Sequence, residues 1–354
     1  MAEYISFQPK DFFNNVLYNG TGSSQAVTGV GFEPGATWIK NRPSGYKNEI
    51  FDSVRGVTKY FSTNDTLVET TDATGLSAFG ADGFTVVSSN ETNRSGGDSF
   101  ISWNWKLGTT TGIAGSPSIT PTAYSFNATA GQSVIAYTGN GVAGATLPHG
   151  LGVAPEFMFT KNLEVGGRDI HVYHVSMGPT RRLYLNQNSS VLTNSTSWND
   201  TAPTSTLFSV GTNEGVNEST KSMVAYCFAS TKGYSKFGLY VGNLASDGPF
   251  IYTGFRPAFI MIKDSDASTN WTNRDITRDP FNPSYNYIYP NLAAAGTAIG
   301  PPVTSGSYPV DFLSNGFKIR NTDDKLNTSG NSYIYAAFAE FPTVSSNDVP
   351  GLAR

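Results

Sequence analysis

The stretch GVGFEPGATWIK (Gly29 to Lys40) occurs three times in the chain with the same order of residue types. It returns as GLGVAPEFMFTK (Gly150 to Lys161) and as TGFRPAFIMIK (Thr253 to Lys263), and in each copy the lysine follows the proline by six positions. A glycine turn that leads into apolar, β-branched and aromatic residues is typical of a turn and a strand. A repeated unit determines the architecture more firmly than local propensity does, so we predict three related modules.

A second landmark, an alternating aromatic strand, closes each copy. It reads SFISWNWK (Ser99 to Lys106), SMVAYCFA (Ser222 to Ala229) and SYIYAAFA (Ser332 to Ala339). Strands with a period of two need one buried and one solvated face, and two stacked antiparallel sheets provide both. The predicted fold class is therefore all-β, with three tandem antiparallel β-sandwich modules of jelly-roll-like type.

The module boundaries follow from the spacing of these landmarks. We predict modules at residues 1–113, 114–231 and 232–345, followed by a C-terminal tail at 346–354. The Ser/Thr/Gly-rich tract from Leu107 to Thr122 is the best candidate for a linker. The second junction is too short to flex, so the second and third modules should be rigidly coupled.

The composition excludes several classes of protein. The 354 residues include 23 Lys and Arg against 27 Asp and Glu, a net charge of -4 that does not favour binding to nucleic acid. No apolar run is long enough for a membrane span, so membrane insertion is not expected. One cysteine, Cys227, and three histidines offer neither an internal disulfide nor a zinc cluster. We expect no cofactor, and stability that comes from packing.

The series of motifs, each in itself only a strand and a turn, carries a resemblance. It includes GVGFEPGATWIKNR, FDSVRGVTKYFSTN (Phe51 to Asn64), AYTGNGVAGATLPHGLGVAP (Ala136 to Pro155) and DFLSNGFKIR (Asp311 to Arg320). In this order the motifs resemble the repeat-containing, tail-fibre-like virion-surface proteins of marine tailed bacteriophages. The resemblance implies a particle component on the virion exterior and supplies no catalytic residue. The second module departs from it by lacking FDSVRG.

One acid and base pair recurs and invites two interpretations. Asp52-x-x-Arg55 returns as Asp275-x-x-Arg278, whereas the second module has His174 and Met177 at the equivalent positions. The pair could face a ligand, or it could be a structural ion pair whose members change together because a lone buried charge is costly. We expect the structural ion pair.

Other polar motifs are weaker. His171-x-x-His174 would point to opposite faces of a strand, and Asp264-x-Asp266-x-Ser268 lacks the glycine and glutamate of an EF-hand, so we expect no metal site and a solvated turn. Cys227 lies within a strand and is expected to be a small buried side chain. No catalytic residue is predicted.

Aromatic residues in segments that differ between the modules form the candidate binding surface. Four lie in the third module, where the loop FNPSYNYIYP makes this region longest, and one lies in the second: Trp271, Tyr285, Tyr287, Tyr289 and Trp198. Flat aromatic faces beside Asn and Tyr suit a sugar or a partner protein. The alternative is that they pack a long loop, since alternating tyrosines have the spacing of one strand face.

These features together predict a non-enzymatic structural component of the phage virion surface, either a tail-fibre adhesin or a capsid decoration protein. Its expected partners are other virion structural proteins and a host surface glycan, and a second copy of the chain is a further candidate. The alternative function is a depolymerase of host surface polysaccharide, because a glycosidase needs only two carboxylates brought together in space.

Overall fold

The computed structural model describes residues 8–296 and 308–341, and the predicted tail at 346–354 lies outside them. The structure is 41% strand and 6% helix, and its strands form six antiparallel sheets. The prediction of an all-β, sandwich-like protein is therefore confirmed. The sheets fall into three pairs, each of one larger and one smaller sheet, and we call residues 8–105, 106–229 and 230–341 the first, second and third modules.

The first module begins with a short 3-10 helix, η1 (Pro9–Asp11), and contains one helical turn, α1 (Asn90–Asn93). Its larger sheet has the order β1-β9-β3-β4-β5-β6 and its smaller sheet the order β2-β8-β7. The strands are β1 (Phe13–Asn19), β2 (Gln25–Thr28), β3 (Ala36–Asn41), β4 (Asn48–Asp52), β5 (Lys59–Ser62), β6 (Thr70–Thr71), β7 (Leu76–Gly80), β8 (Gly83–Val86) and β9 (Ser99–Trp105).

The second module has a seven-stranded sheet of order β10-β11-β18-β13-β14-β15-β16 and a pair, β12 and β17. Its helical turns are α2 (Ser195–Trp198) and α3 (Glu214–Asn217). The strands are β10 (Ala123–Asn127), β11 (Gln132–Thr138), β12 (Ala145–Pro148), β13 (Phe157–Asn162), β14 (His171–His174), β15 (Arg181–Tyr184), β16 (Leu192–Thr193), β17 (Leu207–Val210) and β18 (Ser222–Phe228).

The third module has a four-stranded sheet of order β19-β25-β21-β22 and a three-stranded sheet of order β20-β24-β23. Its helical turn is α4 (Asp324–Asn327). The strands are β19 (Ser235–Val241), β20 (Phe250–Tyr252), β21 (Arg256–Asp264), β22 (Thr272–Asp275), β23 (Val310–Leu313), β24 (Gly316–Ile319) and β25 (Ser332–Phe341).

The two repeated landmarks become neighbouring strands in every module. The Pro-to-Lys segments form β3, β13 and β21, and the aromatic segments form β9, β18 and β25. The two strands pair antiparallel, with equivalent residues opposite each other: Trp38 with Trp103, Phe159 with Tyr226, and Met261 with Ala336. The conserved offsets in the repeat therefore specify the same central strand pairing three times.

The described residues form four hydrophobic cores. Three lie between the paired sheets of one module each, and the fourth joins all three modules. We call this fourth core the central aromatic cluster, and its rings include Trp103, Phe159 and Phe338. Because the sheet residues alternate in direction, β9, β18 and β25 place one set of side chains in their own sandwich and the other in the shared cluster.

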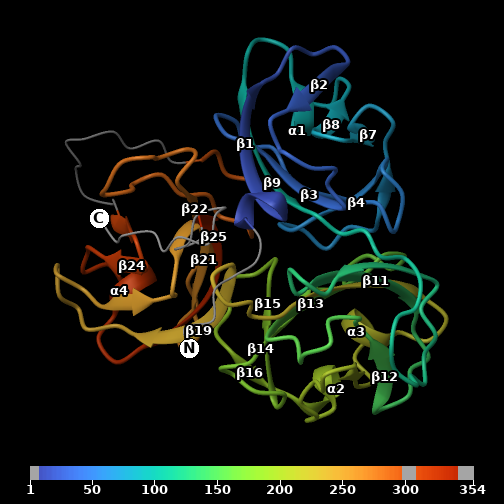
Figure 1. The fold of residues 1–354 in the computed structure, drawn as a ribbon. Coiled ribbons are helices and arrows are strands. Elements are labelled where there is room, and N and C mark those ends of the chain that lie inside the picture. The colour runs from blue at the N-terminus through green and yellow to red at the C-terminus, as the bar shows by residue number, and fades with distance from the viewer. Residues whose placement is uncertain (1–7, 297–307, 342–354) are drawn as a thin grey trace.

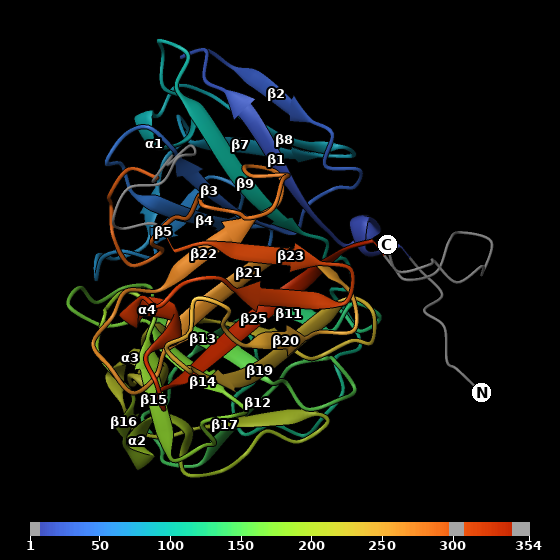
Figure 2. The same ribbon diagram turned by 90° about the vertical axis from the view of Figure 1, so that its left-hand side faces the viewer.

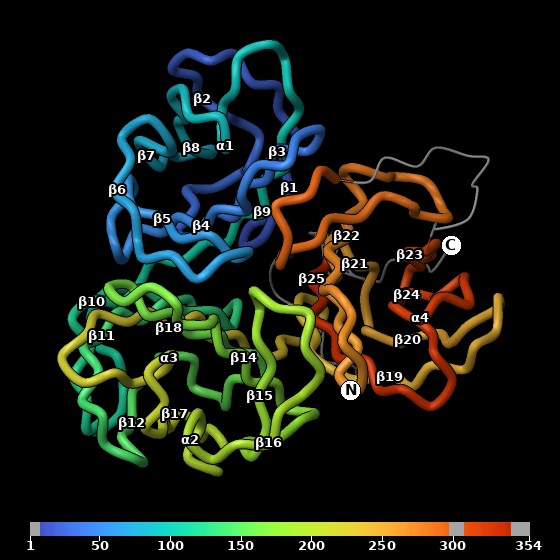
Figure 3. Tube along the Cα trace, turned by 180° about the vertical axis from the view of Figure 1, so that it is seen from behind, coloured from blue at the N-terminus to red at the C-terminus, as the bar shows by residue number. Residues whose placement is uncertain are grey.

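The modules form a closed ring and not a row (Figures 1 and 3). The residue two positions after each repeated lysine accepts a backbone hydrogen bond from a loop of the preceding module. The three bonds run from Glu69 N to Leu163 O at 2.9 Å, from Val191 N to Ser265 O at 2.8 Å and from Gly296 N to Arg42 O at 2.7 Å. The third module therefore meets the first as each module meets its neighbour in sequence, so the ring has threefold pseudosymmetry.

The expected linker between the first two modules is packed against the second. Thr109 and Phe126 form a bridge with two backbone hydrogen bonds, and Ile119 is buried in the core of the second module. The Ser/Thr/Gly-rich tract therefore does not act as a free linker, because its backbone groups bond to β10 and to Thr146. At the second junction, buried Tyr234 donates a hydrogen bond to Gln132 at 2.7 Å, which agrees with rigid coupling.

Candidate functional site

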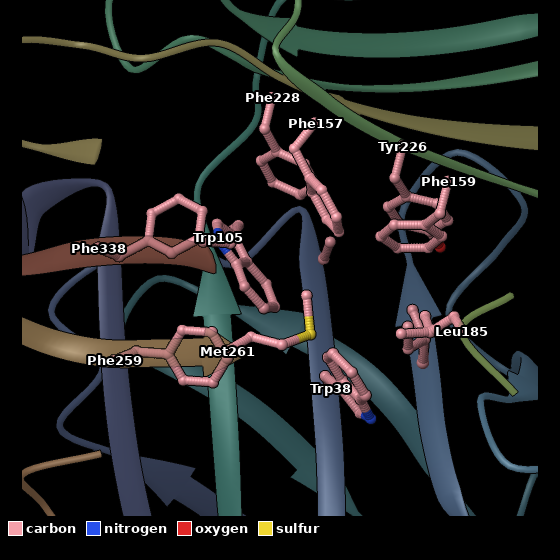
Figure 4. Close-up of a pocket in the computed structure, with 13 residues that line it drawn as sticks. Trp38, Trp105, Phe157, Phe159, Leu185, Tyr226, Phe228, Phe259, Met261 and Phe338 are labelled. Carbon is pink, nitrogen blue, oxygen red and sulfur yellow. The ribbon is translucent and has the colours of Figure 1, made fainter. Parts of the chain in front are cut away.

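The centre of the ring is an apolar packing core. A cavity of about 30 Å³ lies in the central aromatic cluster, and its lining comes from all three modules (Figure 4). Rings of Trp38, Phe159 and Phe259 surround it together with the thioether of Met261. An apolar cavity of this size stays dry and has no room for a sugar.

The recurring Asp and Arg pair is a buried ion pair at the boundary between the first and second modules. Asp52 Oδ2 lies 2.5 Å from Arg55 Nε, and both side chains are almost fully buried. The hydroxyl of Tyr226, in the second module, donates a hydrogen bond to the same carboxylate. Glu69 gives Arg55 a second carboxylate at 3.0 Å. Burial opposes the charge on Arg55, but Asp52 and these partners together raise its pKa above the ordinary value.

The third module forms the equivalent contact with the first. Asp275 Oδ2 lies 2.6 Å from Arg278 Nε, and it also accepts a hydrogen bond of 3.2 Å from Trp103 Nε1. The Arg278 guanidinium lies over the Trp103 ring, 5.8 Å from its centre. Both Asp-x-x-Arg pairs therefore bind an aromatic donor of the next module, and neither faces solvent.

The second module contacts the third through an imidazole. His174 Nδ1 accepts a hydrogen bond from Ser176 N, which leaves the Nε2 proton to be donated to Tyr335 O at 3.2 Å. Burial lowers the pKa of His174 to about 4, although its hydrogen bond to Tyr335 opposes this effect, so the imidazole is neutral at pH 7.

The partner residue explains why aspartate and arginine change together. The strands β9, β18 and β25 carry Trp103, Tyr226 and Ala336 at equivalent positions. Where that residue is an aromatic donor, the neighbouring module supplies a carboxylate; where it is alanine, no side-chain donor exists and His174 bonds to the backbone instead. The interpretation as a structural ion pair therefore fits the geometry.

The three repeated lysines also have a structural role. Lys40, Lys161 and Lys263 are fully buried, and burial lowers the pKa of each to about 8. Their ammonium groups donate to backbone carbonyl groups, among them Arg168 O at 3.1 Å from Lys161 and Ala267 O at 3.0 Å from Lys263. Each lysine thus fixes the turn that receives the neighbouring module.

Burial removes three residues from the predicted binding surface. Trp198 lies in the core of the second module, Trp271 in the central cluster, and Tyr287 in the core of the third module, with exposed fractions of 1%, 1% and 4%. These rings fill space between sheets, so they cannot contact a ligand at the surface. Tyr285 and Tyr289 are half-buried, and their role in binding stays a prediction.

The structure places exposed aromatic rings on another part of the third module. Phe250 and Tyr252 lie on β20, at the solvent face of the smaller sheet, and are 45% and 62% exposed. Across the sheet, Phe250 pairs with Lys318 on β24, and Lys318 pairs with Asp311 on β23. The third module faces the viewer in Figure 2.

Charged side chains form a network beside these rings. Asp247 lies 2.8 Å from Lys318 Nζ and 2.5 Å from Arg320 Nη1, and Arg320 Nε lies 3.4 Å from Asp311. We call Phe250, Tyr252 and these four charged residues the aromatic face. Its two acids and two bases balance, so the face has no net charge.

The aromatic face is specific to the third module. The positions of Phe250 and Tyr252 hold Ala26 and Thr28 in the first module and Thr146 and Pro148 in the second. Two aromatic residues flanking Ile251 in GPFIYTGF were a signal in the sequence, because alternation predicts that both rings leave the core on the same side.

The remaining sequence motifs have structural roles. His171 and His174 face different partners, Ser197 Oγ at 3.0 Å and Tyr335 O. Asp264 accepts hydrogen bonds from the backbone of its own turn, but it is fully buried, so the expected solvated turn is wrong at this residue. Cys227 is buried, as expected, and burial raises the pKa of its thiol to about 12.

Within residues 8–296 and 308–341, no group of three or more His, Cys, Asp or Glu side chains could hold a metal ion. In the same residues, no helix has the length and apolar character needed to cross a membrane.

The fold and its contacts define a ring of three β-sandwich modules, of which the third carries the aromatic face. A family model described as a domain of unknown function (DUF7483) matches residues 8–342, and the chain belongs to this family. No curated protein matches the sequence.

Proposed function

We propose that this protein is a non-enzymatic structural component of the exterior of a bacteriophage virion, and that its aromatic face binds a neutral glycan of the host surface. The observation that carries the glycan proposal is the pair of exposed rings, Phe250 and Tyr252, which the other two modules lack. The resemblance of the motif series to virion-surface proteins supports the location on a particle.

The chemistry of the aromatic face favours a sugar chain. Exposed rings offer flat apolar surfaces for the C–H faces of sugar rings, and the adjacent carboxylates and cations can bond to hydroxyl groups. Because Asp247 and Asp311 balance Lys318 and Arg320, an uncharged polymer fits better than an acidic or basic one. The network also holds the charged groups in position before binding.

The closed ring supports a structural role. Its repeated polar residues bond to neighbouring modules, and its central cavity is too small for a substrate. A rigid body with threefold pseudosymmetry suits either the tip of a fibre or a position on a capsid, the two placements that the sequence left open.

Binding to neutral oligosaccharides tests the proposal. We expect the purified chain to bind at least one member of a panel of malto-, cello-, laminari- and mannohexaose, or intact host cells. The double variant Phe250→Ala/Tyr252→Ala should lose about tenfold in affinity, a change that corresponds to about 1.4 kcal/mol. Leu239→Ala is the matched control, because it removes a 41% exposed side chain from another sheet of the same module.

Two results would contradict the proposal. Equal affinity in the double variant would exclude the aromatic face, and shortened oligosaccharides would support the depolymerase alternative. Cryo-electron microscopy of intact particles tests the location independently, and density for the ring on the virion exterior is the expected result.

A further inference from the structure

The interior of the third module contains an arginine where the other modules have aromatic rings. Arg274 on β22 is opposite Ile260, which belongs to the core between the two sheets of this module. The equivalent residues are Phe51 and Tyr173, both buried in the cores of their own modules. Arg274 is fully buried too, so the third module encloses a charged group in a place that the fold fills with an apolar ring.

The guanidinium of Arg274 is only partly satisfied by its surroundings. Nη1 donates to Ser284 O at 3.2 Å, and the group lies 5.2 Å from the centre of the Tyr287 ring. Nε and Nη2 are buried without a hydrogen-bond partner, and so is the hydroxyl of Ser284. These unpartnered groups belong to one neighbourhood, because the main chain of Ser284 already touches the guanidinium.

No carboxylate in the described part of the chain forms an ion pair with Arg274. Asp279 is near enough for its charge to raise the pKa of Arg274, but its Oδ2 accepts backbone hydrogen bonds of 2.5 Å from Tyr285 and 3.1 Å from Asn286. Burial lowers the pKa of Arg274 to about 10, which leaves it charged at neutral pH. A buried charge costs several kcal/mol unless a counter-charge accompanies it.

We propose that the interior of the third module binds a monovalent inorganic anion, with chloride as the physiological ion, through Arg274 Nε and Nη2 and Ser284 Oγ. A single negative charge balances the single positive charge of Arg274. A spherical monoanion can accept hydrogen bonds from several N–H and O–H donors at once. A water molecule would accept hydrogen bonds but would leave the charge unbalanced. Phosphate would bring a second charge and need more donors than the site offers.

Thermal unfolding of the whole chain tests this site. The melting temperature should be higher in sodium chloride than in sodium gluconate of equal ionic strength, by roughly 3 °C when chloride is about 100-fold above its dissociation constant. Bromide should replace chloride and give an anomalous scattering peak beside Arg274 in a crystal. The same melting temperature in both salts, or a bromide-soaked crystal without that peak, would overturn the proposal.

Two variants separate a specific site from a general salt effect. Arg274→Met keeps a long side chain without charge and should abolish the chloride dependence, whereas Arg181→Met, at an exposed arginine of β15, should retain it. Should Arg274→Met fail to fold, Ser284→Ala serves instead and should shift the chloride midpoint to higher concentration by several-fold. Chloride dependence that persists in Arg274→Met, or an unchanged midpoint in Ser284→Ala, would refute the site.

Discussion

The contacts that the first and third modules make with their neighbours differ from the contact that the second module makes. The first and third modules each use a buried carboxylate, an arginine and an aromatic donor, whereas the second module uses a neutral imidazole and a backbone carbonyl. The geometry of the ring is the same in all three places. The comparison shows that the backbone arrangement tolerates different polar groups, provided that each buried donor and charge has a partner.

Removing one member of an Asp and Arg pair should have the largest effect. Asp275→Ala leaves Arg278 buried without its carboxylate, and we expect a loss of about 3–5 kcal/mol in the free energy of unfolding. Urea denaturation measures the loss. The double variant Asp275→Ala/Arg278→Met should lose less than the single one. Glu214→Ala, in an exposed pair with Arg168, is the control and should cost at most about 1 kcal/mol. Equal losses in Asp275→Ala and Glu214→Ala would contradict a buried structural pair.

The imidazole contact of His174 should make the stability of the three-module ring sensitive to acid. Between pH 6.5 and about 4 the unfolded chain protonates His174 but the folded chain does not, so the stability present above pH 6.5 falls as the pH falls. This group contributes about 1.4 kcal/mol per pH unit, or about 3 kcal/mol over the window. His174→Gln keeps a donor for Tyr335 and should reduce the slope of stability against pH. Leu239→Ala should leave the slope unchanged. An unaltered slope in His174→Gln would show that the histidine does not titrate in this way.

Removing the hydroxyl of the aromatic donor Tyr226 should have the next largest effect on stability. Tyr226→Phe removes only the hydroxyl that bonds to Asp52, and we expect a loss of about 1.5–3 kcal/mol because the acceptor is charged. Tyr252→Phe removes a hydroxyl from an exposed ring and should change the melting temperature little. If both variants have the same melting temperature, the hydroxyl of Tyr226 does not stabilise the boundary between the first and second modules.

The smallest effect concerns the second carboxylate of Arg55. Glu69→Gln leaves the pair with Asp52 intact, so we expect a loss of about 1 kcal/mol, less than in Asp275→Ala. The effect should shrink in high salt, since Glu69 is partly exposed. Melting temperatures in low and high salt measure it. A loss as large as that of Asp275→Ala would mean that Glu69, and not Asp52, is the main partner of Arg55.

The repeated motifs were sufficient to predict the strands but not the ring. Pro34 to Lys40 and its two copies have the alternation and turn residues of a strand, and the structure pairs them with the aromatic strands in equivalent registers. The residues that close the ring include Glu69, Val191 and Gly296, which share no side-chain chemistry. Their contacts use backbone N–H groups, and any residue other than proline can supply one.

The candidate binding residues show a second limit. Tyr287 and Trp271 lie in a long, divergent loop region, and divergence suggested exposure, yet both side chains pack into the cores. The alternation of side chains along a strand predicts which residues share a face, but it does not predict which face of the sheet is exposed to solvent. For Phe250 and Tyr252 that information comes from the position of β20 in the smaller sheet.

The closed ring fixes the copy number of the repeat. In an open solenoid, each added unit finds the same free surface, and the array can lengthen by duplication of one unit. Here the surface of the first module that would receive a fourth unit is already occupied by the third, through Arg42 and Gly296. Duplication of a single module would leave a unit with no docking surface. Evolution can therefore change the loops and faces of individual modules far more easily than their number.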